Sequence, residues 1–296
     1  KKAVVQAQKA DVIFYTMGLS QKESGEAASM TSLKLPEVQM QLLEKLKSTG
    51  KPIVVLLVVA RPIELEEETE KVSSLLLTWN PGTMAGAALG EVVSGDYNPS
   101  GKLTLSFPLV TGQVPLYYNM KNTGRPMGLK SVSSEKYKSR YIDCPNEPLY
   151  PFGYGLSYTT FEYVNPSVKV DNGIYSVSID VKNVGKFAGK EVVQLYVSAP
   201  NRFQMNKPEK ELKAFTKTKE LRPGETVTAT LKLNTTDLAS YDEASSSWVV
   251  DAGNYKFLIG TSSKDIKAVL DVDVVSVVEK TNDILKPQET VNTIKR

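Results

Sequence analysis

Helix-like and strand-like segments alternate in the first third of this chain of 296 residues. Residues 12–17 and 53–59 are short apolar runs, and residues 36–47 between them repeat apolar side chains at helical spacing. The run at 53–59 is β-branched and apolar throughout, which is typical of a strand covered on both faces. The pattern continues with a strand at 74–79, a helix at 82–93 and a short strand at 102–107. This order predicts an α/β/α sandwich domain with a mostly parallel sheet over residues 1–108.

From about residue 158 the pattern changes to short alternating segments separated by turn residues. The clearest segments lie at 175–181, 191–197, 226–233 and 255–259. About seven such segments in roughly 115 residues, with no helical run between them, indicate an all-β domain. The sequence therefore predicts an antiparallel β-sandwich of immunoglobulin or fibronectin III type over residues 158–276.

Residues 109–157 and 277–296 follow neither pattern. The first stretch is rich in Pro, Gly, Tyr and Asn and is longer than an ordinary connection between domains. Its many aromatic side chains predict a linker that wraps and packs onto a domain. The last stretch is polar and unpatterned, so we expect a tail.

Histidine is absent from the chain, and Cys144 is its one cysteine. These absences exclude a Ser-His-Asp triad, a Cys-His dyad, a histidine-rich zinc site and an internal disulfide, and Cys144 is expected to be an ordinary loop residue. The net charge is +3 without a dense basic block, which gives no support for nucleic-acid binding. The most apolar run, residues 53–60, is too short to cross a bilayer, so we expect no membrane insertion.

Two glycine patterns come close to nucleotide-binding loops but have the wrong spacing. Five residues separate Gly95 from Gly101, and Leu103 follows Lys102, whereas a phosphate loop needs four residues and then Ser or Thr after the Lys. The glycines at 82, 86 and 90 recur every fourth residue, which indicates close packing of one helix face. We therefore expect no nucleotide, no other cofactor and no metal.

Two segments carry candidate chemistry. Glu23 and Glu26 lie on the loop after the first predicted strand, where ligands bind in open α/β sheets, although such a pair can also be a solvated acidic loop. Residues 150–158 place aromatic side chains beside glycines, an arrangement that can stack on sugars or form a packed hinge between domains.

Several segments in order along the chain are similar to the C-terminal half of family 3 glycoside hydrolases, particularly bacterial periplasmic β-glucosidases. They include Ser24-Gly-Glu-Ala-Ala-Ser29, Gly50-Lys-Pro-Ile-Val-Val55, Trp79-Asn-Pro-Gly82, Gly95-Asp-Tyr-Asn-Pro-Ser-Gly-Lys-Leu103, Gln113-Val-Pro-Leu-Tyr-Tyr118, Tyr150-Pro-Phe-Gly-Tyr-Gly-Leu-Ser-Tyr158 and Gly189-Lys-Glu-Val-Val-Gln-Leu-Tyr196. The resemblance implies an α/β sandwich followed by a fibronectin III-like domain, and an N-terminal barrel that this chain lacks. The chain also starts directly inside a predicted element, as a truncated or processed chain does.

The resemblance implies that Glu26 is the general acid/base of a retaining β-glucosidase, with Glu23 as the alternative. The nucleophilic aspartate would lie on the absent barrel. The family often has Arg where Met30 stands and Asp where Ser32 stands, and these departures predict altered packing of the loop. The acid must hold its proton at working pH, which requires burial against the substrate and a nearby nucleophile. We therefore expect this chain alone to be inactive.

The expected partners are a β-linked oligosaccharide or glucoside and the missing barrel. The barrel would cover a large apolar face on residues 1–108, and that face left bare predicts association, including a homo-oligomer. The resemblance implies a periplasmic or secreted bacterial protein. The alternative is a non-catalytic carbohydrate-binding or interaction module that uses residues 150–158. A nucleotide enzyme is a third reading that the glycine spacing disfavours.

Overall fold

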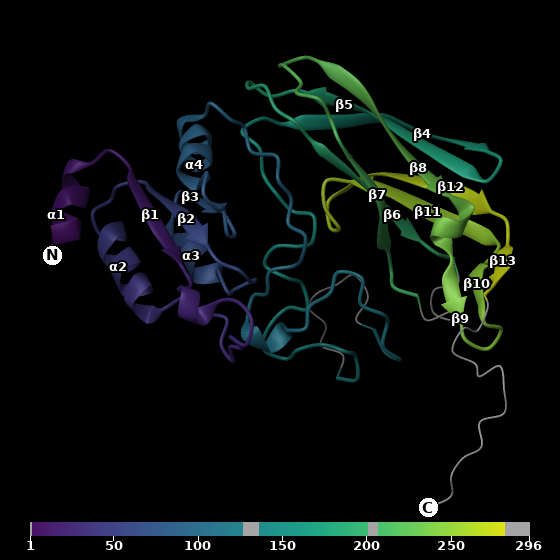
Figure 1. Ribbon diagram of the computed structural model, residues 1–296, viewed down its shortest axis with the longest axis horizontal. Helices are drawn as coiled ribbons and strands as arrows, with labels where there is room; N and C mark the ends of the chain where they lie inside the picture. Colours follow the sequence, from purple (N-terminus) through teal and green to yellow (C-terminus); the bar gives the residue numbers. More distant parts are fainter. Residues whose placement is uncertain (1, 127–135, 201–206, 282–296) are drawn as a thin grey trace, which may run out of the picture. The chain divides into compact units, whose positions relative to one another are not determined.

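The chain divides into two compact units in a computed structural model that describes residues 2–126, 136–200 and 207–281 (Figure 1). One unit comprises residues 1–158 together with Ser262–Lys264, and the other comprises residues 159–261 and 265–296. The first unit mixes helices with a parallel sheet, and the second is almost entirely antiparallel strands. The predicted fold class, an α/β domain followed by a β-sandwich, is therefore confirmed.

The first unit is built on a three-stranded parallel sheet of order β1-β2-β3. The strands and four α-helices confirm the predicted alternation, except that the acidic helix α3 lacks the apolar periodicity that would predict it. Short 3-10 turns, η1 and η2, lie at Gln21–Glu23 and Thr111–Gln113. The elements are α1 (Lys2–Lys9), β1 (Ile13–Gly18), α2 (Glu37–Lys47), β2 (Ile53–Val58), α3 (Glu66–Lys71), β3 (Ser74–Leu77) and α4 (Ala85–Ser94).

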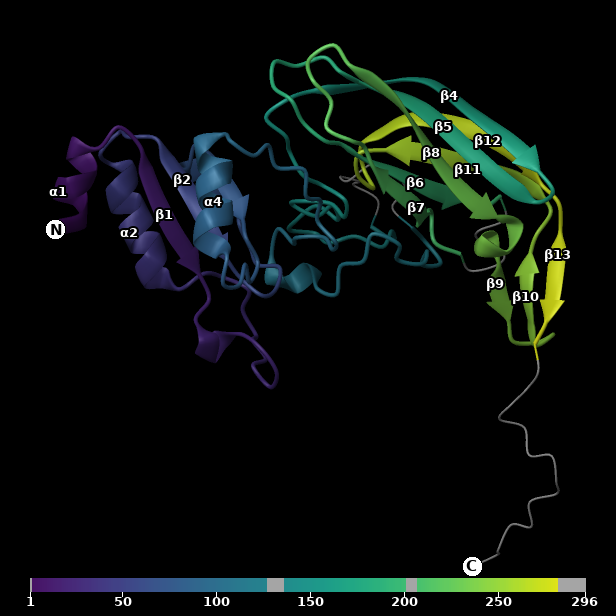
Figure 2. The ribbon, with the colours of Figure 1, turned by 45° about the horizontal axis from the view of Figure 1, so that its top comes forward.

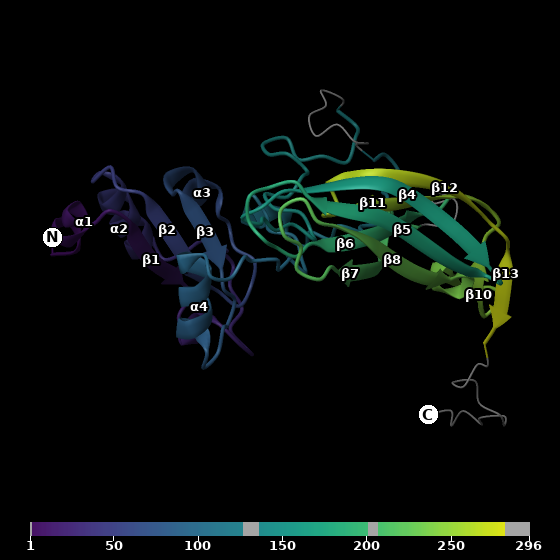
Figure 3. The same ribbon diagram turned by 90° about the horizontal axis from the view of Figure 1, so that it is seen from above.

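One face of this sheet is buried and the other is partly open. Val55 and Leu57 of β2 pack with Leu43 of α2 in the core of the unit. Helix α4 lies on the opposite side of the sheet from α2 and contributes no buried residue (Figure 3). Phe14 of β1 is 54% exposed. The large apolar face that the sequence predicts for residues 1–108 stays a prediction.

The strand predicted at 102–107 is wrong. Leu103 accepts a backbone hydrogen bond from Gly153 and donates one to Tyr154, and Phe107 forms an isolated antiparallel bridge with Tyr150. This segment therefore pairs locally with residues 149–154 and does not join the parallel sheet. The pairing ties part of the predicted wrapping linker to the first unit, and residues 127–135 of that linker lie outside the described residues.

The second unit is a β-sandwich of two antiparallel sheets, one of order β4-β5-β8 and the other β12-β11-β6-β7 (Figure 2). Alternate residues of β5 point inward, so Val177 and Ile179 pack in the core with Phe257 and Ile259 of β11. This alternation is the signal that predicted the sandwich. The strands are β4 (Phe161–Asp171), β5 (Ile174–Asn183), β6 (Val192–Ser198), β7 (Glu211–Lys217), β8 (Thr226–Asn234), β9 (Ser240–Asp242), β10 (Ser247–Val250), β11 (Gly253–Gly260), β12 (Ile266–Val274) and β13 (Val277–Lys280), with a 3-10 turn, η3, at Thr235–Leu238.

A third small sheet, β13-β10-β9, corrects the predicted start of the tail. Residues 277–280 form β13, in which Val277 pairs with Val250 and Lys280 pairs with Ser247. Cross-strand hydrogen bonding orders these residues although their sequence has no clear alternation. The rest of the predicted tail, residues 282–296, lies outside the described residues.

Candidate functional site

The candidate site lies on the loop that follows β1, at the carboxyl end of the parallel sheet. Parallel strands bring the ends of β1 and β2 to the same edge, so the loop after β1 meets the segment after β2. The β1 loop carries both predicted carboxylates, Glu23 and Glu26. The β2 segment carries Arg61, whose side chain reaches that loop. The topology therefore places a cation beside the two predicted site residues.

The start of the loop is fixed at Gly18. A Cβ atom at this position would lie 1.9 Å from the carbonyl oxygen of Val58, so only glycine fits against β2. The Gln39 side chain accepts a hydrogen bond from the Gly18 N–H at 2.9 Å and donates one to the Gly18 carbonyl at 2.8 Å. Helix α2 therefore holds the point at which the chain leaves the sheet.

Glu26 lies in a tight turn at the tip of the loop. The Ala28 N–H donates to the Gly25 carbonyl at 3.3 Å, which makes Glu26 and Ala27 the two central residues of the turn. Gly25 has φ 103° and Ala27 has φ 57°, so the backbone on both sides of Glu26 is left-handed. Glu26 is exposed, and its carboxylate has no hydrogen bond or ion pair to the part of the chain that the structure describes. The turn presents a free carboxylate outward.

Glu23, the alternative candidate, is already engaged. Its Oε2 accepts hydrogen bonds from the Ser20 N–H at 2.9 Å and the Ser20 hydroxyl at 2.7 Å. These hydrogen bonds lower the pKa of the Glu23 carboxyl. A carboxylate held in its charged form is a poor proton donor. Glu23 is therefore held by Ser20, whereas the Glu26 carboxylate has no such hydrogen bond among the described residues.

The return of the loop is anchored to the segment after β2. The Glu64 N–H donates to the Leu33 carbonyl at 2.8 Å, and the Leu33 N–H donates to the Thr111 hydroxyl at 3.0 Å. Thr111 in turn donates its N–H and its hydroxyl to the Glu64 carboxylate. Sequence reasoning missed Arg61, Glu64 and Thr111. The available signal was the position of Arg61, directly after the apolar run at 53–60 and so near the carboxyl end of a parallel strand.

Comparison with known proteins assigns this chain to a family. Residues 1–158 match the glycosyl hydrolase family 3 C-terminal domain, and residues 191–263 match a fibronectin type III-like domain. The chain belongs to glycoside hydrolase family 3. The chain is 40% identical over 270 residues to a periplasmic β-glucosidase of Salmonella typhimurium, a match that covers 90% of this chain and 34% of that protein.

Other members of the family match this chain with similar identity and over a similar share of their own length. A β-xylosidase of Formosa agariphila is 39% identical over 273 residues, covering 90% of this chain and 36% of that protein. The crystal structure of a β-glucosidase from Listeria innocua in complex with glucose matches with a TM-score of 0.86 at 40% identity, over 93% of this chain and 38% of that one. The chain thus spans about a third of the length of the curated family 3 relatives it matches.

The resemblance predicted that Met30 and Ser32 would alter the packing of the loop, and this stays a prediction. Met30 is partly buried and Ser32 is exposed. Within the described ranges, hydrogen bonds tie residues 24–33 to three other residues: Arg61 and Glu64 donate to this loop, and the Thr111 hydroxyl accepts from it. The loop is therefore held without an arginine at position 30.

The aromatic residues of 150–158 are occupied in packing within the first unit. The Tyr150 and Tyr154 rings stack with centroids 5.0 Å apart, and Phe152 stacks on Tyr118 at 4.2 Å. The Tyr158 hydroxyl donates to the Val92 carbonyl at 2.9 Å. Because these rings stack on one another, the geometry gives little support to a sugar-binding platform here.

The glycine-rich segment at 95–101 has a structural role. The Lys102 ammonium donates to the Gly155 carbonyl at 2.8 Å. A Cβ atom at Gly155 would lie 2.3 Å from the Gly101 carbonyl oxygen, so the two backbones pack closely. The lysine that would bind phosphate in a nucleotide loop is used to join two segments of the first unit.

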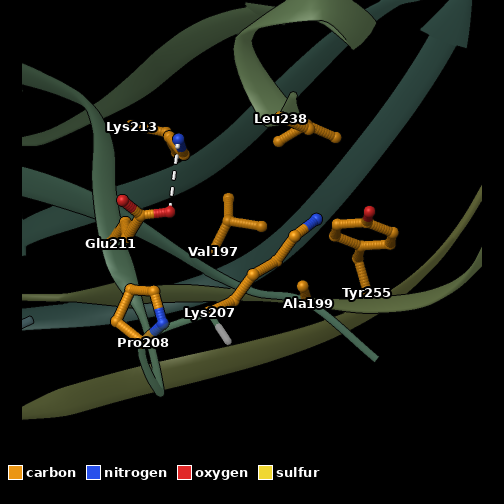
Figure 4. A pocket seen from close by; sticks show the side chains of 8 residues that line it. All are labelled: Val197, Ala199, Lys207, Pro208, Glu211, Lys213, Leu238 and Tyr255. Carbon is orange, nitrogen blue, oxygen red and sulfur yellow. Dashed lines mark ion pairs between the residues drawn. The ribbon is translucent and has the colours of Figure 1, made fainter. Parts of the chain in front are cut away.

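A small pocket in the sandwich unit is too small to hold a sugar. It is lined by residues that include Lys207, Lys213 and Tyr255 (Figure 4). Its volume is about 10 Å³, which is the room that one water molecule needs. The Lys207 ammonium lies 3.2 Å from the Asp251 carboxylate, so its charge is paired.

The described residues offer no metal site and no membrane span. Across residues 2–126, 136–200 and 207–281, no three Cys, Asp or Glu side chains gather in a way that could hold a metal ion. No helix in the same ranges is long and apolar enough to cross a bilayer.

Proposed function

We propose that this chain is the C-terminal part of a retaining β-glucosidase in which Glu26 is the general acid/base. The observation that carries the proposal is the turn at residues 25–28, which presents a carboxylate free of other hydrogen bonds at the ligand-binding edge of the sheet. Relatives of this chain are named β-glucosidase and β-xylosidase. The proposed substrate is therefore a terminal β-linked glucose or a similar sugar. The name of one relative supports a periplasmic or secreted location.

The proposed reaction needs two carboxyl groups about 5–5.5 Å apart, one as nucleophile and one as proton donor. Glu26 would protonate the leaving oxygen while an aspartate from outside this chain attacks the anomeric carbon. In the second step Glu26 would take a proton from water, and the glycosyl-enzyme bond would break. No metal or cofactor enters this scheme. The isolated chain supplies the acid without the nucleophile, so it is proposed to be inactive.

An assay of a chromogenic β-glucoside on three samples tests the proposal. The samples are this chain, the complete protein from the source gene, and the complete protein with Glu26→Ala. We expect activity in the complete wild-type protein alone, with a loss of about 10²–10⁴-fold in the variant, the usual contribution of general acid–base catalysis. Hydrolysis by this chain alone, or full activity of the variant, would overturn it.

A further inference from the structure

Arg61 connects the segment after β2 to both sides of the Glu26 turn. Its Nη2 donates a hydrogen bond to the Glu23 carbonyl at 3.1 Å and another to the Ala28 carbonyl at 2.7 Å. These carbonyls lie three residues before Glu26 and two residues after it. One guanidinium nitrogen therefore sets the distance between the two ends of the segment that carries Glu26.

The other anchors of the loop lie farther from Glu26. Gly18 and Leu33 are fixed at the two ends of the loop, by Gln39 and by Glu64 with Thr111. Within the described residues, the hydrogen bond that ties residues 24–32 to another segment is the one that Arg61 donates to the Ala28 carbonyl. The position of the turn relative to the sheet thus depends on this side chain.

The chemistry of arginine suits this task. The guanidinium stays charged at all working pH values, and its planar fork loses little freedom when it binds. Hydrogen bonds from a charged donor are stronger than those between neutral groups. Gly25 gives the turn a flexible neighbour, and Ala27 holds a left-handed conformation that L residues disfavour. A turn of this kind needs an external contact to keep one conformation.

We propose that Arg61 is a positioning residue that holds the Glu26 carboxylate in place for proton transfer. The inference rests on the proposed function of Glu26. Within the described residues, the hydrogen bonds of Arg61 go to backbone carbonyls, so Arg61 is not proposed as the proton donor. Removing the Arg61 side chain lets the turn move. The rate of proton transfer to the leaving oxygen then falls most, because that step depends on the position of the Glu26 carboxyl group.

The kinetic test uses the complete protein with Arg61→Ala and Arg61→Lys, and two substrates. Phenyl β-glucoside needs its leaving group protonated, and dinitrophenyl β-glucoside does not. For Arg61→Ala we expect kcat/KM on the phenyl substrate to fall about 10–100-fold, the scale of a misplacement of about 1 Å, with a much smaller fall on the dinitrophenyl substrate. Arg61→Lys keeps a charged donor and should retain more activity than Arg61→Ala.

Lys71→Ala is the matched control. Lys71 is another cation of the first unit, and it pairs with Glu44 and Glu67. It should leave both rates near those of the wild type. Equal losses on both substrates for the two Arg61 variants would mean a general structural role and would overturn the inference, as would no loss on either.

Hydrogen exchange on this chain gives a readout that does not depend on activity. Arg61→Lys and Arg61→Ala should each speed exchange of the Ala28 amide, while amides in the middle of β2 stay as slow as in the wild type. Unchanged exchange at Ala28 would contradict the inference. Full activity of Glu26→Ala would overturn the proposed function. Faster exchange of the Ala28 amide in the Arg61 variants would still show that Arg61 holds the turn.

Discussion

At the scale of single residues, the backbone around Glu26 is unusual. Ala27 has φ 57° without being glycine, and it follows Glu26 in a turn closed between Gly25 and Ala28. Strained residues of this kind gather at functional sites, where the surrounding structure holds them. Here Arg61 and the ends of the loop do so, and the result is an outward carboxylate. The strain can be measured separately from activity.

Replacing Ala27 by glycine should stabilise this chain. Glycine adopts φ > 0 without the penalty of about 1–2 kcal/mol that an L residue incurs. Glycine also loses more entropy on folding, so we expect the free energy of unfolding to rise by about 0.5–1 kcal/mol. Ala28→Gly is the control, since Ala28 does not have positive φ, and it should destabilise by about 0.4–1 kcal/mol. Urea unfolding measures both, and a loss of stability in Ala27→Gly would contradict the account.

The pKa of Glu23 gives a second prediction at this scale. Hydrogen bonds from Ser20 lower the pKa of Glu23 in the folded chain. A lowered folded pKa stabilises the loop above the unfolded pKa of roughly 4.3, and this stabilisation is lost as pH falls through the folded value. Ser20→Ala should raise the pKa of Glu23 towards its ordinary value. Carbon-detected NMR titration of the carboxyl group measures this, and an unchanged pKa would show that the Ser20 hydroxyl is not the cause.

At the scale of elements, the two faces of the parallel sheet differ. Val55 and Leu57 of β2 are fully buried, whereas Leu56 between them is partly exposed on the other face. The sequence of β2 is apolar at every position, so the pattern alone predicted a strand covered on both faces. Helix α2 buries the face that carries Val55 and Leu57, whereas α4 on the opposite side contributes no buried residue. A single sequence does not show how closely each helix packs.

Leu57→Ala and Leu56→Ala form a matched pair on neighbouring positions of β2. Leu57→Ala leaves a cavity in the core of the first unit, and we expect it to reduce the free energy of unfolding by about 2–5 kcal/mol. Leu56→Ala removes the same atoms from a partly exposed face and should cost clearly less. Thermal unfolding of the isolated chain measures both variants. Equal effects would mean that the second face is as well covered as the first.

Sequence periodicity worked best for elements held by burial. It located the three parallel strands, α2, α4 and the sandwich strands that have alternating residues. It failed at α3, whose acidic sequence has no apolar periodicity, and where tertiary hydrogen bonds decide the structure, as at residues 102–107 and at β13. The position of Glu26 followed from a family resemblance, but the contacts that hold it did not. Those contacts join residues far apart in the chain, and no local pattern encodes them.

At the scale of the whole molecule, the chain carries one half of a proposed catalytic pair. It spans about a third of its curated family 3 relatives, and the proposed nucleophile is supplied from outside it. In this proposal the chain contributes the edge of a parallel sheet and an anchored loop that presents Glu26. Catalysis in this account depends on a second carboxyl group that approaches this loop.

The central claim is that Glu26 is the acid/base of a retaining reaction, and azide rescue tests it most directly. The measurement is the product that the complete protein with Glu26→Ala releases from dinitrophenyl β-glucoside in the presence of azide. Without a base to activate water, the glycosyl-enzyme should accumulate. Azide should then restore turnover and give the β-glucosyl azide, because it needs no deprotonation to attack. Wild-type rates without azide, or no β-glucosyl azide when it is added, would contradict the account.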